Sequence, residues 1–328
     1  MTESIEHVVS VAKAADLLQL LRPTGALWGD RPKDWIFRGQ SDCSRLLIPL
    51  AYRDEAWLPF QVAGYPLHQP THTYPEQIDR QEREELSLLR RFVYACDAAG
   101  LAIPEHMRVR ELINLGTSNS EIFFADPAIQ TLMALAQHHG IPTRLLDFTR
   151  NSLHAAYFAA SSSATKFSIG KNGKLGVWAV SLAFLVYASS LSSHISTDPI
   201  NLRIVTAPSA TNANLRAQLG LFLLWWHNSK GMRTLDFKSS LEELKRLVAS
   251  HLSKQPWVGH AFIKFELPWS ESATLCRILA DENINGARMF TGYDGVVRSL
   301  KEQAVWDRYL GPLGSSRDGF FFKHKRLE

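Results

Sequence analysis

An arginine between an aromatic residue and a glycine is the first group in this sequence that could do chemistry. It is Arg38, within the segment Asp34–Gln40, which reads Asp-Trp-Ile-Phe-Arg-Gly-Gln. The apolar residues favour a β-strand, and Gly39 either ends the strand or lets another group approach the backbone closely. A guanidinium at a strand end can bind an anion with two hydrogen bonds, or it can form an ion pair with a neighbouring carboxylate. This segment alone leaves both interpretations open.

A second group of polar residues lies in the segment Ala136–Thr149, which reads Ala-Gln-His-His-Gly-Ile-Pro-Thr-Arg-Leu-Leu-Asp-Phe-Thr. Gly140 is typical of the residue that follows a helix C-terminus. His138, Arg144 and Asp147 stand among apolar residues, so each needs a polar partner in the folded protein. They could line a site. Alternatively, Arg144 and Asp147 tie down the loop while His138 caps a carbonyl.

A third group comprises a late arginine–glutamine pair and two carboxylates. Arg216 and Gln218 are two residues apart in the segment Asn214–Phe222, so they share a face if that segment is extended. Glu266 comes at the end of a predicted strand, where it is either a site carboxylate or a solvated strand residue. Asp294 lies in a predicted loop and is either a site carboxylate or part of a turn.

The composition is that of a soluble globular protein. The chain has 328 residues, of which 45% are hydrophobic and 21% charged, and its net charge of +4 permits an anionic ligand. The three cysteines form no CxxC pair, which argues against a disulfide framework or a cysteine zinc site and fits a cytoplasmic location. His138 and His139 are adjacent, so they point apart on a helix and make a poor metal pair. We expect no bound metal and no membrane span.

The hydrophobic pattern predicts an α+β fold with a single mixed or antiparallel sheet and helical insertions. Predicted strands cover residues 35–39, 174–182, 219–226 and 261–267, and predicted helices cover 4–22, 76–99, 105–115, 127–137, 153–160, 238–252, 270–283 and 296–310. Residues 189–213 are predicted to be a long connection. We expect the N-terminal helix and loop of residues 1–29 to belong to the same body as a domain at 30–310. That domain contains a helical insertion at about 76–135, and residues 311–328 form a C-terminal tail.

These motifs together resemble the bacterial FRG domain, a family named for its aromatic–Arg–Gly motif. The resemblance rests on Phe37–Gln40, Ala136–Thr149 and Asn214–Phe222, and it covers roughly residues 30–300. The segment Phe290–Gly295 is similar to the C-terminal motif of the family, Phe-Pro-Asp-Leu-Asp-Gly, and keeps its Phe, its last Asp and its Gly. The family resemblance does not by itself name an activity.

A second resemblance bears on chemistry. An aromatic–Arg–Gly sequence at the end of a first strand is similar to the opening motif of arginine-type ADP-ribosyltransferases, which implies an ADP-ribosyltransferase-like sheet. It also implies that Arg38 holds the pyrophosphate of NAD, that Gly39 lets the nicotinamide approach the backbone, and that a carboxylate stabilises the transition state. We find no Ser-Thr-Ser strand in the expected place and no Glu-x-Glu or Gln-x-Glu loop. The candidate carboxylates are therefore Asp147, Asp294 and Glu266, of which Asp147 and Asp294 match motifs of the FRG family.

The resemblance therefore implies an NAD-dependent enzyme that cleaves the nicotinamide–ribose bond and modifies a macromolecule, with DNA or RNA as an acceptor. Analogy with such enzymes suggests a toxin or phage-defence role. The expected catalytic residues are Arg38, His138, Asp147 and Asp294, and the expected NAD-binding residues are Phe37, Arg38, Gly39, Gln40, Arg144, Thr149, Arg216 and Gln218. Two alternatives remain: a hydrolase or nuclease using His138 and Asp147, and a non-enzymatic module that binds nucleotides or nucleic acid.

Overall fold

The computed structural model describes residues 6–28, 32–60, 74–114, 120–168, 170–195, 201–206, 216–226, 241 and 260–311. Within these residues, seven strands form one sheet in the order β1-β7-β4-β2-β3-β6-β5. The strands are β1 (Glu6–Ser10), β2 (Trp35–Gln40), β3 (Leu145–Thr149), β4 (Lys174–Ser181), β5 (Asn201–Val205), β6 (Gly220–Trp226) and β7 (Phe262–Pro268). β1 and β7 are parallel, and the other neighbours are antiparallel. The predicted α+β class with a single mixed sheet is confirmed.

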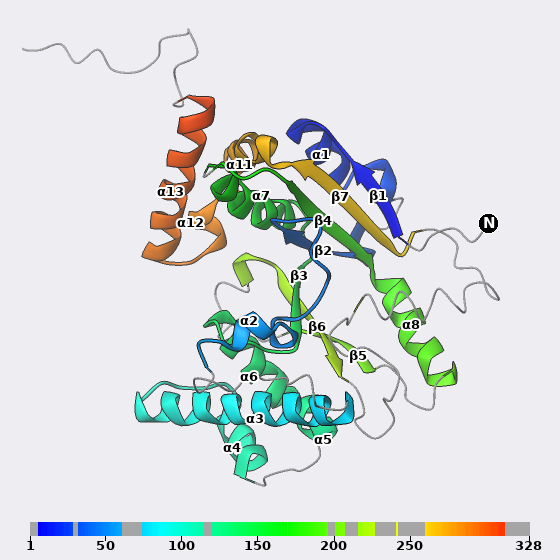
Figure 1. Ribbon diagram of the computed structural model, residues 1–328, viewed down its shortest axis with the longest axis vertical. Coiled ribbons are helices and arrows are strands. Elements are labelled where there is room, and N and C mark those ends of the chain that lie inside the picture. The colour runs from blue at the N-terminus through cyan, green and yellow to red at the C-terminus, as the bar shows by residue number, and fades with distance from the viewer. Residues whose placement is uncertain are drawn as a thin grey trace, which may run out of the picture.

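The helices connect these strands and cover the sheet (Figure 1). They are α1 (Ala14–Leu21), α2 (Asp54–Trp57), α3 (Tyr74–Ala98), α4 (His106–Asn114), α5 (Ser120–Ala125), α6 (Pro127–His138), α7 (Ser152–Ser168), α8 (Leu182–Ile195), α11 (Ser272–Asp281), α12 (Gly286–Met289) and α13 (Tyr293–Leu310). The predicted helical insertion corresponds to α3, α4, α5 and α6, which lie between β2 and β3 in the chain.

The sheet is nearly divided between β2 and β3. β2 pairs with β4 at six positions and β3 pairs with β6 at five, but β2 and β3 pair only at Phe37 and Thr149. The strands diverge beyond that pair, so backbone groups on their facing edges lack the usual ladder partners. Figure 1 shows β1, β7, β4 and β2 in the upper half of the molecule and β3, β6 and β5 in the lower half.

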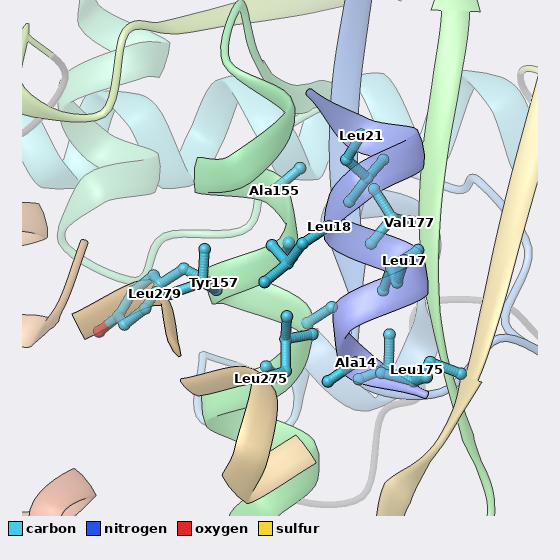
Figure 2. Close-up of a cluster of buried hydrophobic side chains, with 14 of the residues drawn as sticks. Ala14, Leu17, Leu18, Leu21, Ala155, Tyr157, Leu175, Val177, Leu275 and Leu279 are labelled. Atoms are coloured by element: carbon cyan, nitrogen blue, oxygen red, sulfur yellow. The ribbon is translucent and has the colours of Figure 1, made fainter. Parts of the chain in front are cut away.

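Helices α1, α7 and α11 pack on β4 and β7 around a shared hydrophobic core (Figure 2). Leu17 and Leu21 of α1 meet small residues of α7, including Ala155, and Val177 of β4. The small side chains allow α7 to lie very close to β2. A Cβ atom at Gly39 would stand 1.9 Å from the carbonyl oxygen of Ala155, so glycine is needed there for helix–strand packing.

The helical insertion covers the lower half of the sheet, where Ile129 and Met133 of α6 share a core with Leu145 of β3. Asp126 caps α6 by accepting a hydrogen bond from the amide of Ala128. At the other end of α6, Gly140 adopts φ +87°, and the amide of Ile141 donates to the carbonyl of Ala136. This Schellman arrangement ends the helix and directs the chain into β3.

Three sequence predictions need correction or fall outside the described residues. Residues 4–22 form strand β1 followed by α1 rather than one helix, because Glu6–Ser10 pairs in parallel with β7 and this tertiary contact outweighs helical spacing. Residues 189–213 contain the end of α8 and strand β5 rather than only a connection. The predicted helix 238–252 lies outside the described residues except for Leu241.

Candidate functional site

A cavity of about 350 Å³ opens beside the point where β2 and β3 diverge. Its walls come from both strands, from β6, from the C-terminal end of α6 and from α7. The aromatic lining residues are Phe37, Phe148, Phe158, Phe222 and Phe290, and the polar ones are Arg38, Arg53, Gln137, His138, Asp147, Thr149 and Gln218. The cavity therefore combines apolar walls, aromatic in part, with several convergent polar groups, as small-molecule sites usually do.

Arg38 bridges the split in the sheet. Its Nη1 donates to the backbone oxygen of Asp147 at 2.7 Å and also contacts that residue's carboxylate at 2.5 Å. The guanidinium thus supplies a donor where the β2–β3 ladder supplies none. Only 14% of the Arg38 side chain is exposed, and its buried Nε has no hydrogen-bond partner among the described residues. An unused, desolvated donor beside a cavity is suited to an anionic ligand.

Arg53 is a second cation on the pocket wall. Its Nε and Nη2 donate to the carbonyl of Ile48 at 3.2 and 2.8 Å, which fixes the direction of the guanidinium. Burial lowers the pKa of Arg53, and the positive charges of Arg38 and Arg45 lower it further. An arginine stays charged even so. The lining residues Arg38 and Arg53 outnumber the single carboxylate of Asp147, so the pocket attracts anions.

Asp147 is an ionised carboxylate at this site. Its side chain is 62% exposed and is held on one side by Arg38. Desolvation raises the pKa of Asp147, but the charge and hydrogen bond of Arg38 outweigh this and hold the pKa below its usual value. Asp147 is therefore suited to stabilising a positive charge rather than to donating a proton at neutral pH.

His138 ends α6 at the pocket rim and is exposed. Desolvation lowers the pKa of His138, and His139 lowers it further, so the imidazole is neutral at pH 7 and can accept a proton. The neighbouring Gln137 accepts a hydrogen bond from the hydroxyl of Thr143, which joins the helix end to the loop before β3. His138, the candidate general base, therefore lies at a helix end that is held in place by the neighbouring hydrogen bond.

Gln218 connects several segments of another part of the pocket wall through hydrogen bonds. Its backbone oxygen accepts a hydrogen bond from the hydroxyl of Thr149 at 2.7 Å and contacts Nδ1 of His154 at 3.1 Å. Its side-chain amide donates to the backbone oxygen of Met289 at 3.0 Å, one residue before Phe290. The turn that holds Gln218 and the short helix α12 therefore position Phe290 as part of the pocket wall.

Arg144 and Gln40 do not line the pocket, contrary to our prediction. Arg144 is buried against the insertion, where its Nε donates to Glu85 at 2.8 Å and its guanidinium lies 3.5 Å from the ring centre of Phe124. Burial lowers the pKa of Arg144, but the carboxylate of Glu85 raises it above its ordinary value. Gln40 is buried and accepts a hydrogen bond from the indole of Trp178. Both residues satisfy buried polar groups, a structural role that a sequence motif does not distinguish from ligand binding.

Three other candidates also lie outside the pocket lining. Asp294 is exposed in the first turn of α13, and the predicted loop around it is limited to residues 290–292, between α12 and α13. Arg216 is exposed in a helical turn, so it does not share an extended face with Gln218. Glu266, on β7, is bound by Ser10, Lys174 and Lys264. The predicted residues that the structure brings together are Phe37, Arg38, Gly39, His138, Asp147, Thr149 and Gln218.

Sequence reasoning missed Arg53 and several aromatic residues of the pocket. Arg53 follows a short 3-10 helix, Leu50–Tyr52, and belongs to none of the recognised motifs. Phe290 is the aromatic residue that this sequence keeps from the C-terminal motif of the family, and this match was the only indication in the sequence that it belongs to the site. No group of three or more His, Cys, Asp or Glu side chains that could hold a metal ion occurs among the described residues. In the same part of the chain, no helix is long and apolar enough to cross a membrane.

The fold and site define an α+β protein with a positively charged, aromatic-lined pocket at a split in its sheet. Residues 33–167 match the family model of the FRG domain. The match includes β2, the helical insertion, β3 and most of α7, whereas Gln218 and Phe290 of the pocket come from outside it. Neither the curated proteins nor the solved structures gave a match to this chain.

Proposed function

We propose that this protein binds NAD in the pocket between β2 and β3, cleaves the nicotinamide–ribose bond and transfers ADP-ribose to a macromolecule, with DNA or RNA as an acceptor. The observation that carries the proposal is the placement of Arg38, Arg53 and Asp147 in one aromatic-lined cavity. The two arginines would bind the pyrophosphate, since guanidinium groups recognise phosphate oxygens through paired hydrogen bonds.

The cavity dimensions support a nucleotide half rather than a whole dinucleotide. At about 350 Å³ the cavity is at the lower end of the usual range for ligand sites, roughly 300–1,000 Å³. In the proposed arrangement, the nicotinamide ribosyl half enters the cavity beside Phe148, Phe222 and Phe290, and the adenosine half extends over its open mouth. The rings offer flat apolar faces on which the nicotinamide can stack.

The ion pair between Arg38 and Asp147 suggests an order of steps for the proposed reaction. Phosphate oxygens would compete for the Arg38 guanidinium, and its unpartnered Nε adds a donor for them. The released Asp147 carboxylate would then face the ribose. As the C1′–N bond breaks, its electron pair leaves with nicotinamide, and the carboxylate stabilises the cationic ribose. The acceptor forms the new bond to C1′, and neutral His138 takes the acceptor's proton.

A hydrolase is the second candidate, because His138 and Asp147 line the same cavity. In that reaction neutral His138 would activate water, and Asp147 would orient it. A toxin or phage-defence role in the cytoplasm would follow from the transferase by analogy with other enzymes that modify macromolecules, and it rests on that analogy alone.

The test is incubation of the protein with NAD labelled in its adenylate part, alone and with DNA, RNA or cell lysate. Released nicotinamide is measured by chromatography, and transferred label is measured on gels. We expect both signals from the wild type. Loss of one charge-assisted contact costs about 1.5–3 kcal/mol, so Arg38→Gln and Arg53→Gln should each weaken NAD binding roughly 10–100-fold.

Two further variants separate binding from chemistry. Asp147→Asn should keep NAD binding and lose nicotinamide release, because it removes the charge but preserves the shape. Arg91→Gln, an exposed position on α3 outside the pocket lining, is the matched control and should behave as wild type. Binding without release in the wild type would favour a non-enzymatic module. Nucleic-acid cleavage without NAD would favour the hydrolase, and neither binding nor release would refute the proposal.

A further inference from the structure

Helix α13 carries a row of exposed apolar side chains, although it buries Trp306 together with a carboxylate on its inward side. Its buried positions are Gly295, Glu302 and Trp306, so a carboxylate occupies the side facing the body of the protein. Its outward side carries Tyr293, which is 91% exposed, and Leu300, which is 61% exposed. Surface helices normally bury their apolar stripe and expose their charged residues. An exposed apolar stripe of this kind marks an interaction surface.

The stripe follows one face of the helix. Tyr293, Val296, Val297 and Leu300 are spaced i, i+3, i+4 and i+7, and all four are exposed. Figure 1 shows α13 at the margin of the molecule, beside α11 and α12. The four side chains form one surface, which we call the α13 stripe.

The helix cannot turn this stripe inward without breaking buried contacts. A Cβ atom at Gly295 would lie 2.0 Å from the carbonyl oxygen of Phe290, so the first turn of α13 packs directly against the backbone that follows α12. Glu302 accepts hydrogen bonds from the hydroxyl of Tyr157 at 2.6 Å and from the amide of Gly286 at 3.0 Å. These contacts fix the rotation of α13 about its axis, and the outward direction of the stripe is therefore part of the fold.

The charges beside the stripe indicate what covers it. Asp294 and Lys301 are exposed, lie seven residues apart and flank the stripe on the same side. When two such helices pair antiparallel with their stripes in contact, the side of each stripe that carries Asp294 and Lys301 lies beside the same side of the other stripe. The two helices run in opposite directions, so the order of the two charges is reversed from one copy to the other. Asp294 of one chain then lies opposite Lys301 of the second copy, and the two-fold symmetry repeats this ion pair. A parallel pair would not bring these two charges together.

We propose that the α13 stripe is a homodimer interface in which two copies of this chain pair antiparallel through α13. The surface is self-complementary, with a central apolar contact of Tyr293, Val297 and Leu300 and an Asp294–Lys301 pair at each end. Such an isologous arrangement is what a closed two-fold dimer requires. The inference is independent of the proposed NAD chemistry.

The test measures the mass of the full chain by analytical ultracentrifugation over a wide concentration range. We expect a reversible dimer for the wild type and a monomer for Leu300→Glu. Met107→Glu is the matched control, since Met107 on α4 is 72% exposed but far from α13 in the chain, and this variant should remain dimeric. Circular dichroism verifies that each variant is folded. A monomeric wild type at every concentration, or a dimeric Leu300→Glu variant, would overturn the proposal.

Charge reversal tests the antiparallel geometry. Asp294→Lys alone and Lys301→Asp alone each place like charges in contact, and each should raise the dimer dissociation constant about tenfold. The double variant restores opposite charges in exchanged positions and should return the constant to near its wild-type value. Failure of the double variant to recover dimerisation, in a folded protein, would contradict the antiparallel pairing.

Discussion

Replacement of Gly39 by alanine tests whether the motif glycine serves the ligand or the fold. In the structure, an alanine Cβ would stand 1.9 Å from the carbonyl oxygen of Ala155 and 2.8 Å from the amide nitrogen of Ala159. Both atoms belong to the backbone of α7, so no flexible side chain can move aside. We expect Gly39→Ala to destabilise the protein even in the absence of ligand.

The magnitude follows from the displacement that the new methyl group demands. Close carbon–oxygen contacts lie at about 3.3–3.6 Å, so α7 and β2 would have to separate by roughly 1.4–1.7 Å. Overpacking of a well-packed core typically costs about 1–3 kcal/mol, and a backbone clash belongs at the upper end of that range. Alanine also lowers the conformational entropy of the unfolded chain relative to glycine, which stabilises the folded state by about 0.4–1 kcal/mol. We therefore expect a net loss of about 2 kcal/mol or more.

The assay is urea denaturation monitored by tryptophan fluorescence. The matched control is Gly176→Ala on the adjacent strand β4, where the new Cβ would lie 3.2 Å from Cys43 and small shifts suffice, so its cost should stay below about 1 kcal/mol. If Gly39→Ala is no less stable than Gly176→Ala, the packing explanation is refuted. Unchanged stability together with lost NAD binding would instead assign Gly39 to the ligand.

Three further predictions concern the walls of the site. Arg144→Met and Glu85→Gln should each lower the free energy of unfolding by about 3–5 kcal/mol, because each leaves a buried charged partner unpaired. Denaturant unfolding should show that the double variant loses less stability than the sum of the losses in the two single variants. Desolvation lowers the pKa of His154, and its contact with Gln218 only partly offsets this, so the unfolded chain binds the proton more readily. Stability should therefore fall as the pH drops below the ordinary value of 6.5, and His154→Gln should flatten that dependence in denaturation curves taken at several pH values. Phe290→Ala should weaken NAD binding measured by calorimetry by about 1–3 kcal/mol if the ring stacks on the nicotinamide, and an unchanged affinity would contradict that placement.

The sequence predicted the central elements of the fold where local signals and tertiary contacts agree. Asp126 before a proline and Gly140 after the last helical turn marked both ends of α6 correctly. β1 was misread because five residues with two valines carry too little periodicity to separate a strand from the start of a helix. The partner that decides the matter, β7, lies more than 250 residues away in the chain.

The sequence motifs indicated which segments contribute to the site, but not which of their side chains meet in the pocket. Arg38 and Asp147 come from separate motifs, yet they meet because β2 and β3 are neighbours that diverge, a geometry with no local signature. Arg144 had the same appearance in the sequence as Arg38, but its partner Glu85 comes from the helical insertion, and a single sequence does not indicate which carboxylate a buried arginine will find. Arg53 was missed for the converse reason, because no motif surrounds it.

The one-pair contact between β2 and β3 also has a mechanical consequence. The five or six residue pairs that join β3 to β6 and β2 to β4 hold those strands together along their length, whereas β2 and β3 pair only at Phe37 and Thr149. The Arg38–Asp147 ion pair is a further link between the two strands at this junction. The hold between the two parts of the sheet therefore depends on a side-chain contact that salt or a competing anion can weaken.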